Sequence, residues 1–251
     1  MTRSRGTLMV IPFLAAILAT TGPLRASSCH DRSAAGQAKL KIAWLVVTDV
    51  APEAATTGAG SKAVESSEWA DKPMMIYIPS DDPTDSITRK LNSVVFKNEK
   101  VAIAAKFFET LKISRKHALD DRLLASHADP TPQIVFLKRD FTEHAALRKK
   151  KISASRLLKT MKSLVRDEYV NDFDAMVRAY EKLLDELDRL ESRNEVLAKR
   201  RKRLEDQPNP ARERKLEREE EAHEATVDAW LEKEEKLLEL RVRGDQEEAG
   251  T

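Results

Sequence analysis

The centre of the fold is predicted by one stretch of sequence, residues 73–85, which reads PMMIYIPSDDPTD. Five apolar residues, Met74–Ile78, stand between Pro73 and Pro79. A short apolar run bounded by prolines is typical of a strand that is buried on both faces. We therefore expect Met74–Ile78 to be a central strand of a sheet.

A helix is predicted directly after this strand and its polar loop. The apolar residues of the next segment recur at spacings of three and four, as on one face of a helix. They are Ile87, Leu91, Val94 and Val95. Asp85 or Ser86 is a suitable N-cap, because both side chains can accept a hydrogen bond from the first turn.

Strand-like and helix-like segments alternate on both sides of this stretch, from about Leu40 to Val165. That alternation indicates an α/β domain. We expect a first strand at Leu40–Val47, a loop at Val50–Ser66 and a strand at Phe108–Ile113. A further strand, Ile134–Leu137, follows Pro132, and a closing helix begins near Ser153 and carries Leu157, Leu158, Met161, Leu164 and Val165.

The order of these segments resembles the thioredoxin superfamily, most closely its bacterial exported members. The resemblance is carried by Trp69-Ala70-Asp71-Lys72-Pro73 before the central strand, by Val95–Val101, and by Thr131-Pro132 directly before a later strand. It covers about half of the chain and implies a thioredoxin-like domain over residues 40–166. It also implies that Pro132 is a cis-proline packed beside the active-site loop.

The chain departs from that family at the redox site. Asp82 and Asp85 stand at the positions where the family has its Cys-x-x-Cys pair, and neither can form a disulfide. Two carboxylates at this spacing are able to act as an acid/base pair or to hold a cation. Capping of the following helix is the alternative that we favour. The sequence therefore predicts no catalytic residue at this site.

Other chemistry has little support in the sequence. The five histidines show no spacing typical of metal ligands, and no glycine-rich phosphate loop is present. We predict neither a metal nor a cofactor. Lysine plus arginine (44) nearly balance aspartate plus glutamate (42), giving a net charge of +2. A chain without a basic excess is not expected to bind nucleic acid.

The N-terminal residues have the order of a secretory signal peptide. Arg3 and Arg5 precede an apolar run from Leu8 to Ala19, which is too short to span a bilayer and is followed by small residues. We predict a signal peptide over residues 1–28, an exported protein of the periplasm or cell envelope, and a disordered linker over 29–39. Cleavage after Ala26 or after Ser28 satisfies the small-residue rule. The second choice makes Cys29, the single cysteine, the mature N-terminus and a candidate for lipid attachment to a membrane.

The last third of the chain predicts an antiparallel helical hairpin of coiled-coil type over residues 167–243, before a disordered tail, 244–251. Its first helix carries a heptad seam in which Asn194 and Arg201 occupy a positions. A buried Asn at such a position often fixes the register of the two helices, and Arg201 predicts that the seam becomes wetter toward the turn. The complete seam is Tyr169, Phe173, Met176, Tyr180, Leu183, Leu187, Leu190, Asn194, Leu197, Arg201 and Leu204. Pro208 and Pro210 place a turn near 207–210, with Asn209 as N-cap and Pro210 as the first residue of the second helix.

The second helix is predicted to run to about Val242. Its apolar side consists of Leu216, His223, Val227, Trp230, Leu231, Leu237 and Leu238. Either the hairpin is a solvated, self-contained pair, or its residual apolar stripe pairs with a second copy or with a partner protein. Basic residues at Lys199–Arg203 and Arg212–Lys215 surround the turn, but the interleaved glutamates favour a solvated face over an anion site.

Together these patterns favour an exported, non-catalytic protein that acts as a protein-interaction or scaffolding module. The alternative hypothesis is a chaperone or enzyme that binds peptides in the groove beside Pro132 without thiol chemistry. A third hypothesis is that the hairpin alone carries the function by pairing with itself.

Overall fold

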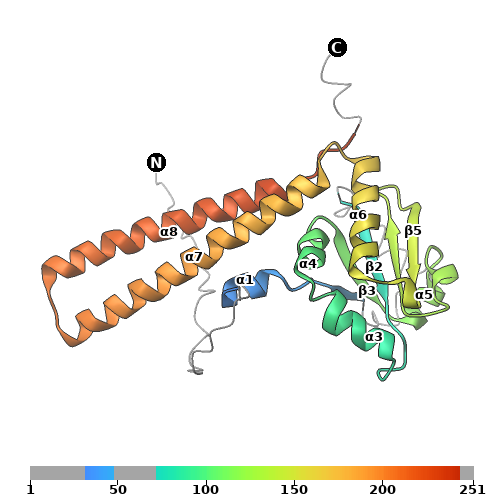
Figure 1. Cartoon of the computed structure of the whole chain (residues 1–251), viewed down its shortest axis with the longest axis horizontal. Helices are drawn as coiled ribbons and strands as arrows, with labels where there is room; N and C mark the ends of the chain where they lie inside the picture. Colours follow the sequence, from blue (N-terminus) through green and yellow to red (C-terminus); the bar gives the residue numbers. More distant parts are fainter. Residues whose placement is uncertain (1–31, 48–71, 244–251) are drawn as a thin grey trace, which may run out of the picture. The chain divides into compact units, whose positions relative to one another are not determined.

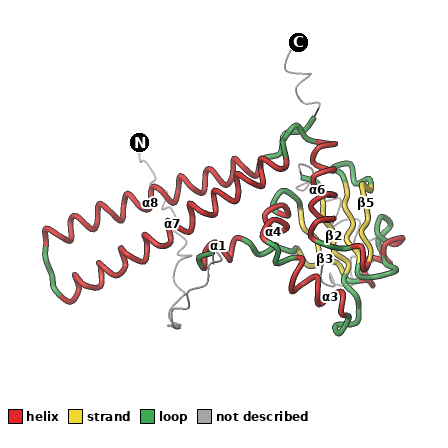
Figure 2. Tube along the Cα trace, viewed as in Figure 1, coloured by secondary structure: helices red, strands yellow, loops and turns green. Residues whose placement is uncertain are grey.

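The computed structural model describes residues 32–47 and 72–243, in which five strands form one mixed sheet (Figure 2). The order across the sheet is β1-β3-β2-β4-β5. The strands are β1 (Leu45–Val47), β2 (Met74–Ile78), β3 (Glu109–Ile113), β4 (Gln133–Leu137) and β5 (Glu143–Arg148). β3 is parallel to β1 and β2, whereas β4 is antiparallel to β2 and β5.

The central strand β2 is buried on both faces, as its sequence predicts: each of its residues is at most 1% exposed. Successive side chains of a strand point to opposite faces. One face of β2 and β4 supplies Met75, Tyr77, Ile134 and Phe136 to a first hydrophobic core. The other face supplies Met74, Ile76, Ile78, Val135 and Leu137 to a second core.

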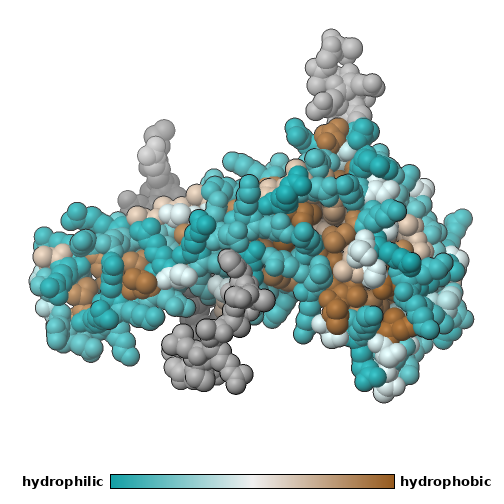
Figure 3. All heavy atoms as spheres, in the orientation of Figure 1, coloured by the Kyte–Doolittle hydropathy of each residue, from teal (hydrophilic) through white to brown (hydrophobic). Residues whose placement is uncertain are grey.

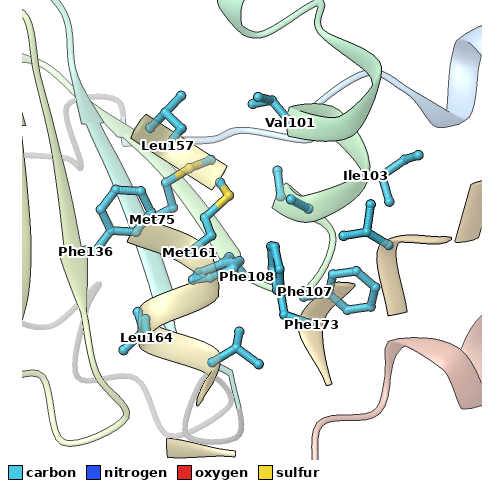
Figure 4. Packing of buried hydrophobic residues seen from close by; sticks show 14 of the residues in the cluster. Met75, Val101, Ile103, Phe107, Phe108, Phe136, Leu157, Met161, Leu164 and Phe173 are labelled. Carbon is cyan, nitrogen blue, oxygen red and sulfur yellow. The ribbon is translucent and has the colours of Figure 1, made fainter. Parts of the chain in front are cut away.

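Helices cover both faces of the sheet. The first core is covered by α3 (Ser86–Lys90) with a π-helical turn (Leu91–Val95), by α4 (Glu99–Ala105) and by α6 (Ala154–Glu168). The second is covered by α5 (Arg115–Asp120) and the 3-10 turn Ala125–His127; another 3-10 turn, Lys149–Lys151, follows β5. Figure 4 shows Leu157 and Met161 of α6 close to Met75 and Phe136 of the sheet.

The π-helical turn corrects one detail of the predicted helical face. The Phe96 N–H donates to the carbonyl oxygen of Leu91 at 2.9 Å, a five-residue spacing that shifts the face of the helix. As a result Val95 is buried, whereas Val94 is 59% exposed. The prediction that Val94 and Val95 share the apolar face is wrong for Val94.

The start of the described chain differs from the prediction in two ways. Residues Ala34–Lys39, predicted to be a disordered linker, form helix α1 with Ser33 as N-cap. The predicted strand Leu40–Val47 is shorter, since only Leu45–Val47 pairs with β3. The apolar side chains of Leu40, Ile42 and Trp44 pack against the first core without joining the sheet.

Two long helices, α7 (Phe173–Asp206) and α8 (Pro210–Leu238), lie side by side and form the predicted hairpin (Figure 1). The Asn209 side chain accepts from the N–H groups of Ala211 and Arg212, and Pro210 opens α8, both as expected. The predicted seam begins too early, because Tyr169 precedes α7 and the chain is not helical at Tyr169–Asp172. α8 ends at Leu238, a few residues before the predicted end.

The base of the hairpin belongs to the first core. Phe173, Met176, Val177, Tyr180 and Leu184 of α7 are part of the same buried cluster as the sheet and α6. Figure 4 shows Phe173 beside Phe107, at the end of α4. Within residues 32–47 and 72–243, no helix is both long and apolar enough to cross a membrane.

Candidate functional site

The loop after β2 carries the predicted positions Asp82 and Asp85, and both carboxylates serve local structure. Asp82 Oδ1 accepts from the N–H and the hydroxyl of Thr84, at 2.8 Å and 2.7 Å. Asp85 is the N-cap of α3 and accepts from the Thr88 N–H at 2.7 Å. The arrangement matches the helix-capping interpretation that the sequence favours.

Hydrogen bonds lower the pKa of both carboxyl groups. For Asp82 the largest cause is the hydroxyl of Thr84, followed by the Thr84 N–H. For Asp85 it is the Thr88 N–H. A general acid needs a raised pKa in order to hold a proton near neutral pH. Both pKa values are lowered, so neither carboxyl group has the raised pKa of a general acid.

Pro132 lies at the same end of the sheet as this loop. The Thr131–Pro132 peptide bond is cis, as is Asp129–Pro130. Ile78, the last residue of β2, pairs with Gln133, the first residue of the antiparallel β4. Pro79, which follows Ile78, and Pro132, which precedes Gln133, therefore lie at the same end of the sheet. The loop toward Asp82 begins there.

Arg115 links this loop to the segment before β4. Its Nε donates to the carbonyl oxygen of Ala128 at 3.2 Å. Its Nη atoms lie 3.5 Å from an Asp81 carboxylate oxygen and 3.9 Å from one of Asp129. Arg115 thus holds the two loops at this end of the sheet together, a role that no local pattern in the sequence indicates.

A second contact that the sequence does not indicate is formed by His127, which is buried beside β4. The imidazole of His127 is 4% exposed and lies between Gln133 and Glu143. Its Nδ1 is 2.6 Å from Gln133 Nε2, and its Nε2 is 3.2 Å from Glu143 Oε2. His127 therefore connects the first residue of β4 to the first residue of β5 through its two ring nitrogens.

A polar cluster joins the base of the hairpin to α1. Glu234 of α8 is 8% exposed, accepts from the hydroxyl of Tyr180 and lies 2.5 Å from Lys39 Nζ. Lys39 also lies over the ring of Trp230, 5.0 Å from its centroid. The Trp230 indole N–H donates to the carbonyl oxygen of Leu183 at 2.8 Å. Burial raises the pKa of Tyr180, and the neighbouring Glu234 raises it further.

An ion-pair cluster fixes the chain just before α1. The Arg32 side chain bonds to Glu99 of α4 at 2.6 Å, and to Asp188 (3.0 Å) and Asp185 of α7. Asp188 also accepts from the N–H and the hydroxyl of Ser33. α1 lies so close to α7 that a Cβ on Gly36 would stand 2.5 Å from Asp188 Oδ1. This docking explains why residues 34–39 are ordered.

The outer half of the hairpin is held by fewer buried residues. Leu197 and Leu216 are buried at 3% and 4% exposure. Asn194, predicted as a buried seam residue that fixes register, is exposed, so this prediction is wrong. A seam of only two helices leaves some of its a/d positions in water. Arg201 is partly exposed and bonds to Glu220, which agrees with the expected wetter seam near the turn.

Several predicted features lie outside the described residues. They are the signal peptide, Cys29, the Val50–Ser66 loop, Trp69–Asp71 and the tail 244–251. Within the described ranges, no group of three or more His, Cys, Asp or Glu side chains is arranged to hold a metal ion.

Comparisons with protein-family models, with curated proteins and with solved structures find no match to this chain. The candidate sites therefore rest on the chain's own residues.

Proposed function

We propose that the chain is an exported, non-catalytic thioredoxin-like protein that acts as a protein-interaction or scaffolding module. The observation that carries the proposal is the use of Asp82 and Asp85. One closes a turn and the other caps α3, at the positions where the resembled family carries its thiols. Neither carboxyl group has a raised pKa.

The thioredoxin-like part of the proposal is supported by the sheet edge. The resemblance implies a cis-proline directly before a strand and beside the loop of the lost redox pair. The cis bond at Thr131–Pro132 and the pairing of Ile78 with Gln133 meet both conditions. Export is supported by the order of residues 1–28 alone.

The interaction role is supported by the hairpin. Its base is fixed in the core, while the helices beyond it carry dense, exposed charge with scattered apolar residues such as Val196, at 46% exposure. A long surface that the rest of the described chain does not bury is available for a partner protein or a second copy.

The catalytic half of the proposal is tested by disulfide-reductase and isomerase assays of the purified chain and of Asp82→Asn/Asp85→Asn. We expect no turnover from either. The matched variant, Asp82→Cys/Asp85→Cys in a Cys29→Ser background, should form an internal disulfide and gain reductase activity. Turnover by the unmodified chain that the Asn variant loses would show that the carboxylates are catalytic.

A Cys variant that cannot form the disulfide would contradict the alignment of Asp82 and Asp85 with the thiol positions of the resembled family.

The proposed interaction role is tested separately by chemical crosslinking in envelope preparations. We expect crosslinks from the hairpin of the full chain that disappear when the hairpin is shortened. Identical crosslinking by both forms would reject the hairpin as the interaction surface.

A further inference from the structure

The closed end of the hairpin contains a pocket that the proposed function does not use. It has a volume of about 450 Å³ and lies between the last turns of α7 and the first turns of α8. Its lining includes the cations Arg200, Arg203, Arg212 and Lys215 and the apolar side chains Leu204 and Leu216. Figure 3 shows hydrophobic atoms between the two helices near this end. We call this concavity the tip pocket.

The glutamates that interleave with these cations in the sequence pair with only some of them in the structure. Glu219 is 2.6 Å from Arg200 and neutralises it. Glu220 and Glu213 pair with Arg201, which does not line the tip pocket. Within the described residues, Arg203, Arg212 and Lys215 form no ion pair. Three cations therefore converge on the pocket against one remaining lining carboxylate, Asp206.

Arg203 stands in the last turn of α7, where a cation is favourable, but the two cations at the start of α8 are unfavourable for the isolated hairpin. Arg212 stands in the first turn of α8 and Lys215 in the second, at the end of the helix where the macrodipole is positive. Arg203, from the neighbouring helix, brings a further like charge to the same pocket. An anion in the pocket would relieve this repulsion, and residues that break a local rule are often found at functional sites.

We propose that the tip pocket binds a phosphate monoester. The excess of two positive charges at the lining matches the charge of about −1.5 to −2 that a phosphate monoester carries near neutral pH. Arginine guanidinium groups hold phosphate oxygens through paired, charge-assisted hydrogen bonds. Leu204 and the buried Leu216 form an apolar floor against which the organic part of the ester packs. The ester is either a soluble metabolite or the headgroup of a phosphomonoester lipid.

The test measures binding of glycerol phosphate to the full chain by isothermal titration calorimetry. Arg203→Ala/Arg212→Ala/Lys215→Ala should weaken binding roughly tenfold or more, because it removes charge-assisted hydrogen bonds. Lys182→Ala/Arg193→Ala/Lys236→Ala, which removes three exposed cations from other parts of the hairpin, should stay within about twofold. Asp206→Asn should strengthen binding, because it removes the remaining lining carboxylate.

A vesicle arm separates the two sources of the ester. Recruitment to phosphatidic acid vesicles but not to phosphatidylcholine vesicles, lost in the tip triple variant, assigns the lipid headgroup. Binding of glycerol phosphate without recruitment assigns a soluble ester. The proposal is overturned if neither probe binds, or if the tip and control triple variants lose binding equally. All substituted positions are exposed, so circular dichroism should show unchanged helicity in every variant.

Discussion

Glu234 illustrates how one carboxylate stabilises the contact between three helices. It is buried, yet it is satisfied by the hydroxyl of Tyr180 and by the ammonium group of Lys39. Lys106, at the end of α4, lies over the ring of Tyr180 and is also close to Glu234. Burial lowers the pKa of Lys106, and Glu234 partly opposes this effect. The buried carboxylate holds its partners in place, and removal of any one partner would leave a buried charged or polar group unpaired.

Glu234→Ala should therefore lower the free energy of unfolding by about 1–3 kcal/mol, because it leaves a buried hydroxyl and a lysine without their acceptor. Glu235→Ala is the matched control, since Glu235 is exposed on the same helix. It should change stability by no more than about 0.5 kcal/mol. Urea denaturation followed by circular dichroism measures both, and equal effects would contradict a role for the buried cluster.

Asp188 makes the docking of the N-terminal segment depend on pH. Burial raises its pKa, but hydrogen bonds from Ser33 and Arg32 outweigh burial and hold the pKa below its ordinary value. A carboxyl group whose pKa is lower in the folded state stabilises the fold above its unfolded pKa, near 4. That contribution is lost as the pH falls through the folded pKa.

We accordingly expect a smaller difference in unfolding free energy between pH 6 and pH 3 for Asp188→Asn than for the unmodified chain. Asp228→Asn, at an exposed position of α8, is the control and should keep the full difference. The measurement is urea denaturation at both pH values. An unchanged pH dependence in Asp188→Asn would show that this contact contributes nothing.

Residue roles were predictable where the partner is close in sequence. Asp85 and Asn209 cap helices as expected, because a cap bonds to N–H groups two or three residues away. The contacts of Arg32 with Asp188 and of Lys39 with Glu234 join residues more than 150 positions apart. Nothing in local periodicity specifies such pairs, so the ordered segment around α1 was predicted as a linker.

The two halves of α7 differ in what covers their apolar stripe. At the base, Tyr180 and Leu184 pack into the core shared with the sheet. Farther along, Leu197 is buried by α8, whereas Asn194 on the same seam is exposed. A heptad pattern predicts which side of a helix is apolar, but the number of neighbouring helices decides how much of that side leaves water.

Leu197→Ala should destabilise the outer hairpin by about 2 kcal/mol, near the lower end of the range for buried leucines. Asn194→Ala should change it by less than about 0.5 kcal/mol, because the amide is exposed. Amide hydrogen exchange of α7 and α8 measures both locally. A larger effect of Asn194→Ala than of Leu197→Ala would restore the register role predicted from the sequence.

At the scale of the whole molecule, the boundary predicted at residues 166–167 divides one hydrophobic core. Phe173, Met176 and Tyr180 are buried in the same cluster as Phe136 of β4 and Leu164 of α6. The coarse architecture, an α/β part followed by paired helices, was predictable from the change in period along the chain. The shared core was not, because periodicity does not say which element an apolar face meets.

A chain that ends at Glu168 should therefore fail to fold cooperatively, since it exposes the core side chains that α7 covers. A shortened hairpin that joins Arg189 to Asp228 through a four-residue Gly-Ser turn should keep the near-ultraviolet circular dichroism of the full chain. Urea melts of both forms make the comparison. Cooperative unfolding of the chain ending at Glu168 would show that the sheet domain is stable without α7.

The two ends of the hairpin are fastened to each other. The Val170 N–H donates to the carbonyl oxygen of Arg241, the Arg241 N–H donates to Asn171, and Tyr169 forms an antiparallel bridge with Val242. The start of α7 and the segment after α8 are thus joined at one point, so α7 and α8 form a closed loop. Seven residues added to each helix would lengthen it by about 10 Å without moving its base. The hairpin can therefore differ in length between proteins that share the same sheet and core, and its length would set how far its tip stands from the sheet.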